Sequence, residues 1–195
     1  LRCRHWIFDM DGTLTVPAHD FQWLRRQLQI PAEADILGFI NGLPEDEAAH
    51  AHDFVNRWEL EIAQSARPQS DAVRLLTTLT AAGCKLGVLT RNTLEGARIT
   101  LRAAGLEPFF ASEDVLGREQ AEPKPKPDGV QALLRRWSAA PSDAVVVGDW
   151  VHDVDAGLAA GTWAILVLRH PNQSELPQAH LNLRRLDELL NSLTP

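Results

Sequence analysis

Residues 6–15, WIFDMDGTLT, decide the fold of this chain. Three apolar residues end abruptly at Asp9 and Asp11, a pattern that predicts a short buried strand with two carboxylates at its carboxyl end. Open α/β sheets bind ligands in the crevice beyond that end. Two carboxylates so close repel each other, so the loop requires a cation or a shared proton. Gly12 permits the tight turn that follows, and Thr13 offers a hydroxyl to an arriving anion.

Beyond residue 69 the chain alternates between apolar runs of strand length and segments with helical periodicity. Ser70 is suited to cap the first of these helices, and Gly83 to end it. Strands joined by helical crossovers imply a mostly parallel sheet with right-handed connections. We therefore predict an α/β fold with a Rossmann-like parallel sheet. The expected strands are 6–8, 85–90, 109–111, 144–147 and 164–168, and the expected helices are 70–82, 93–104, 128–137, 151–160 and 186–193.

The stretch between the first strand and this alternation has helical spacing only. Apolar residues recur at helical intervals from Phe21 to about Ala66, and Pro31, Gly42 and Pro44 divide the stretch into three helices. We expect a small all-helical cap over residues 16–69, inserted into a core domain made of residues 1–15 and 70–195.

The composition narrows the class of protein. A chain of 195 residues that is 45% hydrophobic can bury one substantial core and a small module. The net charge of −7 argues against nucleic-acid binding, which needs clustered Lys and Arg. Cys3 and Cys84 are too few for a disulfide framework or a cysteine zinc site and suit a reducing cytosol. We expect a cytoplasmic monomer or weak dimer without a signal peptide, membrane span or nucleic-acid partner.

Two of the three lysines lie together in residues 122–128, EPKPKPD. The prolines predict an extended, polyproline-like segment. Such a segment has about three residues per turn, so Lys124 and Lys126 point in different directions and at most one reaches a site. The alternative is a solvated loop that carries two charges.

Polar residues also follow the expected strand 85–90. Thr90 meets Asp9 at one edge of a parallel sheet, where its hydroxyl and the N–H groups of Arg91 and Asn92 can hold a phosphate. By itself, a threonine at such a place is more often structural.

Residues 144–153, AVVVGDWVHD, repeat the pattern of a buried strand that ends in a carboxylate. Asp149 is presented at the sheet edge, and Asp153 approaches the same point from the first turn of a helix. The alternative for Asp153 is a carboxylate that only satisfies the helix dipole. Asp155 is expected to be exposed. Together with Asp9 and Asp11, Asp149 supplies hard oxygen ligands without His or Cys, which suits Mg²⁺.

In this order, DMDGT, the strand-terminal Thr90, KPKP and GDWVHD resemble the four signatures of the haloacid dehalogenase-like (HAD) phosphatases. The resemblance covers about residues 1–15 and 70–170 and is weak in the helical insert. A cap directly after the first signature is similar to the branch that includes phosphoglycolate phosphatases. The implied fold is the HAD fold with a small helical cap.

The resemblance implies a covalent phosphoryl transfer. Asp9 attacks phosphorus and forms an aspartyl-phosphate, and Asp11 protonates the leaving group and then activates water. Lys124 is the active-site lysine, which leaves Lys126 to solvent, and Thr90 binds the transferring group. The implied Mg²⁺ ligands are the Asp9 carboxylate, the Asp11 main-chain carbonyl, Asp149 and waters, with Asp153 supporting a bound water.

The expected substrate is a small phosphorylated metabolite, with phosphoglycolate first. A sugar-phosphate phosphatase or phosphomutase is the alternative enzyme. The non-enzyme alternative is a receiver-like phospho-acceptor, although receivers have no acid two residues after the phosphorylated Asp. Asp11 disfavours a dehalogenase, and the lack of lysine between Val16 and Gln69 disfavours a phosphonoacetaldehyde hydrolase. Trp150 and Arg91 depart from the family pattern and leave the substrate open. The expected substrate-binding residues are Gly12, Thr13, Arg91, Asn92, Arg25 and Arg57, and further cap candidates are Arg26, His19, His50 and residues 41–43.

Overall fold

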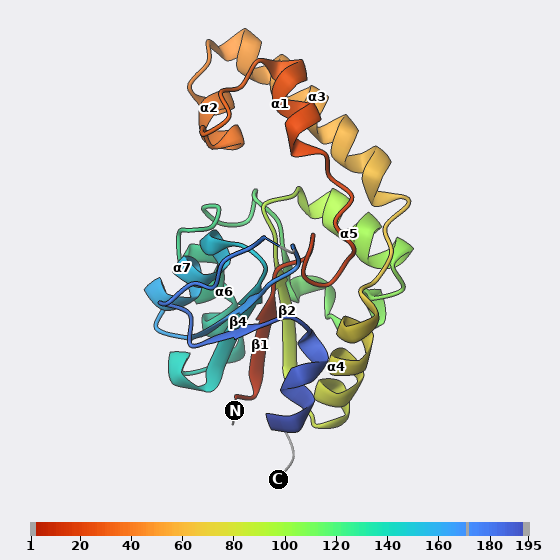
Figure 1. The fold of residues 1–195 in the computed structure, drawn as a ribbon, viewed down its shortest axis with the longest axis vertical. Helices are drawn as coiled ribbons and strands as arrows, with labels where there is room; N and C mark the ends of the chain where they lie inside the picture. The colour runs from red at the N-terminus through yellow and green to blue at the C-terminus, as the bar shows by residue number, and fades with distance from the viewer. Residues whose placement is uncertain (1–2, 171, 193–195) are drawn as a thin grey trace.

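A computed structural model describes residues 3–170 and 172–192, which form an α/β core with a cap of helices beyond one end of its sheet (Figure 1). The sheet is parallel throughout, in the order β3-β2-β1-β4-β5-β6. This confirms the predicted fold class, with its cap after the first strand. The strands are β1 (His5–Phe8), β2 (Lys85–Leu89), β3 (Val115–Leu116), β4 (Ala144–Gly148), β5 (Trp163–Val167) and β6 (Leu181–Leu183).

The register of the central strands sets where the motif residues lie. Phe8 at the end of β1 is level with Val88 of β2 and Val147 of β4. The residues that follow these three strands therefore emerge at one edge of the sheet, as expected for parallel strands.

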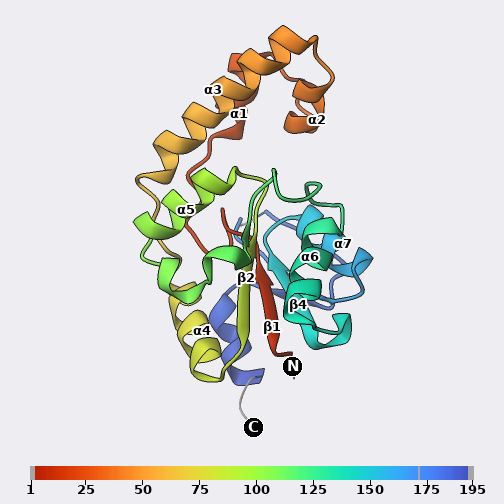
Figure 2. The ribbon, with the colours of Figure 1, turned by 180° about the vertical axis from the view of Figure 1, so that it is seen from behind.

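Helices cover both faces of the sheet (Figures 1 and 2). Helices α4 (Ser70–Ala81) and α5 (Leu94–Ala103) and the 3₁₀ helix η4 (Leu186–Ser192) pack on the face that carries Trp6 and Phe8. Helices α6 (Asp128–Trp137) and α7 (Val151–Ala159) pack on the face that carries Ile7. Each of these strand side chains is fully buried and contributes about 1.5–3 kcal/mol. The strand is thus buried on both faces up to the point where the motif begins.

The cap has a small core of its own. It consists of α1 (Phe21–Leu28), α2 (Ile36–Asn41) and α3 (Glu45–Ala63), with Asp20 and Asp35 capping the first two helices. Two adjacent segments join it to the core domain: Val16 N–H donates to the Arg67 carbonyl at 2.9 Å, and Gln69 N–H donates to the Leu14 carbonyl at 2.8 Å. The buried apolar residues of the cap are Leu24, Ile30, Ile40, Ala51 and Val55.

Three secondary-structure elements of the core domain differ from the sequence-based expectations. The strand expected at residues 109–111 is wrong: Glu107–Phe109 form a 3₁₀ turn, because Pro108 fixes a turn geometry, while Phe110 packs into the core from a loop. The short strand β6 was not foreseen, because three residues centred on a polar Asn give little pattern. The closing helix is a 3₁₀ helix, and its expected last residue, Leu193, lies outside the described residues.

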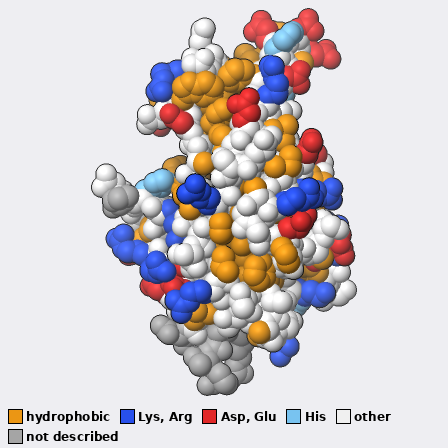
Figure 3. Space-filling view, turned by 90° about the vertical axis from the view of Figure 1, so that its right-hand side faces the viewer, with side chains coloured by type: hydrophobic (Ala, Val, Ile, Leu, Met, Phe, Trp, Pro, Cys, Tyr) orange, Lys and Arg blue, Asp and Glu red, His pale blue; other side chains and the backbone are white. Residues whose placement is uncertain are grey.

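No helix in residues 3–170 and 172–192 is both long and apolar enough to cross a membrane. Figure 3 shows charges of both signs scattered among neutral and apolar side chains on the side of the molecule that it draws, without a continuous basic area.

Candidate active site

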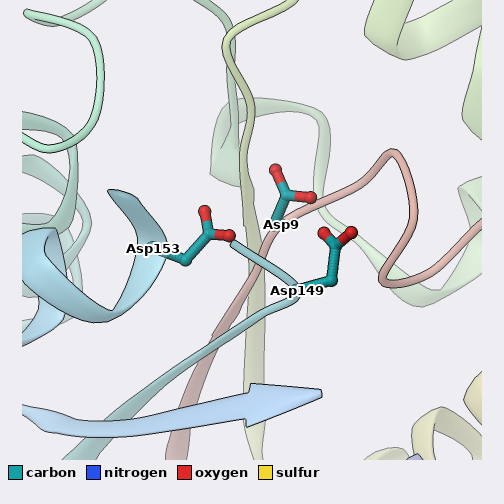
Figure 4. A group of neighbouring side chains, drawn as sticks. All are labelled: Asp9, Asp149 and Asp153. Carbon is teal, nitrogen blue, oxygen red and sulfur yellow. The ribbon is translucent and has the colours of Figure 1, made fainter. Parts of the chain in front are cut away.

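The carboxyl edge of the sheet brings together three aspartates from separate segments. Asp9 follows β1, Asp149 follows β4, and Asp153 lies in the first turn of α7 (Figure 4). One carboxylate oxygen of each lies within 4.8 Å of the others. The pairing of β1 with β4 places the first two side by side, and the start of α7 returns the third to the same point.

Lys124 is the cation of this cluster. Its ammonium group donates to Asp9 Oδ1 at 2.5 Å and to the Leu89 carbonyl at 2.6 Å, and it lies 2.7 Å from Asp153 Oδ1. The side chain is only 3% exposed, whereas Lys126 is exposed. All three ammonium N–H groups are therefore engaged at the carboxyl edge.

The proline-rich segment reaches the site as a turn, so its expected polyproline-like form is wrong. Lys126 N–H donates to the Pro123 carbonyl at 3.1 Å, and the Lys124–Pro125 peptide bond is cis. Prolines exclude a helix here but suit a tight turn as well as an extended chain. The turn still directs one lysine inward and the other outward.

Burial dominates the proton affinities of the acids. It raises the pKa of Asp9 to about 7, against the opposing attraction of Lys124. It raises the pKa of Asp149 to about 8, with repulsion from Asp9 and Asp153 adding to the shift. Burial alone would lower the pKa of Lys124, but the ion pairs with Asp153 and Asp9 hold it above its usual range. The lysine is therefore charged, and its single positive charge does not neutralise all the carboxylates around it.

These residues fit a divalent cation. Three carboxylates face one ammonium group, and oxygen ligands without His or Cys are the set that Mg²⁺ prefers. Asp153 already accepts from Lys124 and from the Trp150 N–H at 3.0 Å. The Asp149 carboxylate accepts only a hydroxyl from the Thr13 side chain, at 3.1 Å, among the contacts found in residues 3–170 and 172–192. The carboxylates of Asp9 and Asp149 are therefore the better direct ligands, and Asp153 holds Lys124.

The loop after Asp9 is shaped around Asp149. Gly12 has a φ of +93°, and a Cβ at this position would collide with the Asp149 carboxylate. Thr13 uses its hydroxyl on that carboxylate. The loop thus brings both acids close together, and the Thr13 hydroxyl is bound to the Asp149 carboxylate.

Asp11 and the loop after β2 lie beside the aspartate cluster. Burial raises the pKa of Asp11 to about 6, opposed by a hydrogen bond from the Asn92 side chain. Thr90 is 4% exposed, and its hydroxyl accepts the Asn92 N–H at 3.0 Å. Arg91 turns to the rim instead, where it donates to Asp35 of the cap at 2.5 Å.

One cap candidate reaches the site. His19 Nδ1 lies 3.8 Å from Asp11 Oδ1, and its ring stacks on Phe21 and meets the edge of Trp58. Burial lowers the pKa of His19, which favours the neutral imidazole. A neutral imidazole that packs on two aromatic rings therefore lies beside Asp11.

The other cap candidates are engaged elsewhere or face solvent. Arg25 donates to the Pro31 and Ala34 carbonyls at 2.7 and 2.8 Å, inside the cap. The exposed Arg57 donates to the carbonyl of Asp53, one turn earlier in α3. The structure does not bring either arginine to the aspartates. The remaining candidates, Arg26, His50 and Asn41, are also exposed.

An ion pair between cap and core was missed from the sequence. Arg118 donates to both Glu59 oxygens at 3.1 and 3.0 Å, and each side chain is 11% exposed. It also donates to Asn56 Oδ1 and to the Arg91 carbonyl, which ties α3 to the loop after Thr90. A signal was available: Glu59 occupies the apolar stripe of α3, four residues after Val55, where a lone charge needs a partner. Nothing in the pattern named Arg118.

Comparison with known proteins identifies a matching family and several similar proteins. Residues 3–161 match the model of the haloacid dehalogenase-like hydrolases. The uncharacterized hydrolase YOR131C of Saccharomyces cerevisiae is 31% identical over 85% of this chain and 78% of its own length. Hexitol phosphatase A of Escherichia coli is 30% identical over 100% of this chain and 97% of its own. The fold of Bacillus subtilis YfnB, bound to magnesium, superposes with a TM-score of 0.71 at 20% identity, covering 100% of both chains.

Proposed function

The chain belongs to the haloacid dehalogenase-like hydrolases, and from that membership we propose that it is a Mg²⁺-dependent phosphomonoester hydrolase that works through an aspartyl-phosphate on Asp9. The observation that carries the proposal is the meeting of Asp9, Asp149 and Lys124 at one sheet edge. The receiver-like alternative has no support in the family match.

The first step is a displacement at phosphorus by the Asp9 carboxylate. A bond forms between an Asp9 oxygen and phosphorus while the bond from phosphorus to the ester oxygen breaks, and Asp11 gives its proton to that oxygen. Lys124 holds the other Asp9 oxygen and fixes the direction of attack. Asp9, Asp149 and the Asp11 carbonyl would hold Mg²⁺, which would supply charge neutralisation for the phosphoryl oxygens when bound.

The second step reverses the role of Asp11. The Asp11 carboxylate takes a proton from water, the water oxygen bonds to phosphorus, and the bond from phosphorus to Asp9 breaks. Inorganic phosphate leaves, and both aspartates return to their starting forms. A pKa of about 6 suits Asp11 to both roles near neutral pH.

The surroundings of Asp11 favour an uncharged, hydroxylated leaving group. His19 lies beside Asp11 and packs on Phe21 and Trp58, and Arg118 is already paired with Glu59. The similarity to hexitol phosphatase A is in keeping with such a group. Phosphoglycolate remains the second candidate because Arg91 at the rim could exchange Asp35 for a substrate carboxylate.

Hydrolysis of p-nitrophenyl phosphate with Mg²⁺ tests the reaction. Asp9→Asn should abolish turnover. Asp11→Asn should still release about one equivalent of nitrophenolate and then stall, because this leaving group needs no acid but the intermediate needs a base. Asp155→Asn, an acid of the same helix as Asp153 and outside the cluster, is the matched control. Steady turnover by folded Asp9→Asn protein would refute the nucleophile.

A panel of phosphoglycolate, hexitol phosphates and sugar phosphates tests the leaving group. We expect the highest kcat/KM for a hexitol or sugar phosphate, and a selective loss for that substrate in His19→Ala. A preference for phosphoglycolate that disappears in Arg91→Met would support the second candidate and contradict the first. Reappearance of the phosphate on another carbon of a sugar would indicate a mutase.

A further inference from the structure

A short segment after β5 contacts both loops of the proposed active site. Arg169 and Gln173 follow β5 at the carboxyl edge of the sheet, beside the loop after β1 and the loop after β4. Neither residue belongs to the motifs that predicted the site.

Arg169 binds the backbone of the first loop. Its Nε donates to the Gly12 carbonyl at 3.1 Å, and its Nη2 donates to the Thr13 carbonyl at 3.0 Å. Nη1 and Nη2 donate to the two carboxylate oxygens of Asp71 of α4, at 2.8 and 3.2 Å. The Arg169 side chain is 9% exposed and Asp71 only 2%. A planar fork with this many partners has one available position.

Gln173 binds the second loop and connects it to the first. Its side-chain amide donates to the Asp149 carbonyl at 2.6 Å, and its Oε1 accepts the Arg169 N–H at 2.9 Å. Thr13, whose backbone Arg169 holds, donates its hydroxyl to the Asp149 carboxylate at 3.1 Å. Asp149 is thus held at its carbonyl through Gln173 and at its carboxylate through Thr13.

We propose that Arg169 and Gln173 are positioning residues that fix the Asp11–Thr13 loop and Asp149 in the geometry that binds the divalent cation. The proposal rests on the proposed function of this site. Partners one step removed from a metal commonly set its affinity, because they hold the ligands in place. The role of Asp71 is different: it accepts from Arg169 and from the Leu186 N–H at 2.9 Å, and so it joins α4 and η4 to the arginine.

Titration calorimetry with Mg²⁺ alone tests the proposal. Arg169→Met and Gln173→Met should each weaken Mg²⁺ binding roughly tenfold and lower kcat, with KM for the phosphoester little changed. The charge change alone would have the opposite effect on Mg²⁺ affinity in Arg169→Met, because the loss of a cation beside the site should strengthen the binding of another cation. Weaker binding therefore reports lost geometry.

Two controls separate positioning from stability. Glu175→Gln changes an exposed residue of the same segment and should leave Mg²⁺ affinity unchanged. Asp71→Asn should lower the melting temperature while Mg²⁺ affinity, measured well below that temperature, stays within about twofold, because Arg169 keeps its two carbonyl partners.

Opposite results would overturn the inference. Wild-type Mg²⁺ affinity in Gln173→Met, or an equal loss in Asp71→Asn and Arg169→Met, would leave these residues with a stabilising role only. If Arg169→Met does not fold, Gln173→Met decides alone. A wild-type protein that binds no Mg²⁺ would refute the proposed function as well, whereas normal wild-type turnover with unaffected variants would refute only the positioning role.

Discussion

Replacing Lys124 with Met is the most direct test of how the site is held together. The side chain keeps its length but loses an ammonium group that contacts Asp9, Asp153 and the Leu89 carbonyl. Two of these contacts are ion pairs. Breaking a buried pair costs about 3–5 kcal/mol, since the remaining carboxylates stay buried without a cation. A domain of this size is stable by about 5–15 kcal/mol, so the variant should fold but be severely weakened.

The loss should depend on pH. At pH 8.5 Asp9 and Asp149 are mostly ionised, because their pKa values are about 7 and about 8 in the intact cluster. At pH 6 the variant can protonate these acids in place of pairing them, so the cost should fall to about 2 kcal/mol or less. Urea unfolding without metal at both pH values measures the difference.

The matched control is Lys126→Met, which removes an exposed lysine two residues away and should change stability by no more than about 0.5 kcal/mol. A loss below about 1 kcal/mol in Lys124→Met at pH 8.5, or an equal loss at both pH values, would refute the reasoning. Activity gives a second readout: it should fall at least about a hundredfold, because the attacking carboxylate loses its orientation and the phosphoryl group loses a cation.

Three further outcomes follow from the geometry. The raised pKa values of Asp9 and Asp149 mean that the metal-free folded state binds protons more tightly than the unfolded state. The stability of the metal-free protein should therefore fall as pH rises from about 6 to about 8, and added Mg²⁺ should reverse this fall in thermal melts. A rise in stability over that pH range without metal would contradict the prediction. Arg118→Met should lower the free energy of unfolding in urea by about 3 kcal/mol, and the double variant with Glu59→Leu should recover much of this loss, because no unpaired charge then stays buried. If the losses of the two single variants simply add in the double variant, the ion pair does not stabilise the protein. Gly12→Ala should lower the free energy of unfolding by at least about 1 kcal/mol and weaken Mg²⁺ binding, because the left-handed φ of Gly12 and the nearby Asp149 carboxylate both oppose a Cβ. An unchanged melting temperature and an unchanged Mg²⁺ titration would show that the loop tolerates a side chain here.

The sequence alone determined the parallel core and most of the acids at its edge. Runs such as Trp6–Phe8 and Ala144–Gly148 are apolar because both faces of a parallel strand are buried, so the polar residue that ends each run marks the carboxyl edge. Parallel pairing then requires Asp9, Thr90 and Asp149 to share that edge. Local pattern and one topological rule suffice for these positions.

Tertiary structure decided the partners of the long and polar side chains. The cap arginines chosen from the sequence do not reach the aspartates. A guanidinium group has several donors, and nearby carbonyl groups can accept them as well as a substrate can, as the Pro31 and Ala34 carbonyls do for Arg25. The arginines that matter at the sheet edge, Arg118 and Arg169, meet their carboxylates across 59 and 98 residues of chain. No periodicity encodes such distant pairings, which exist only once the helices and strands have packed.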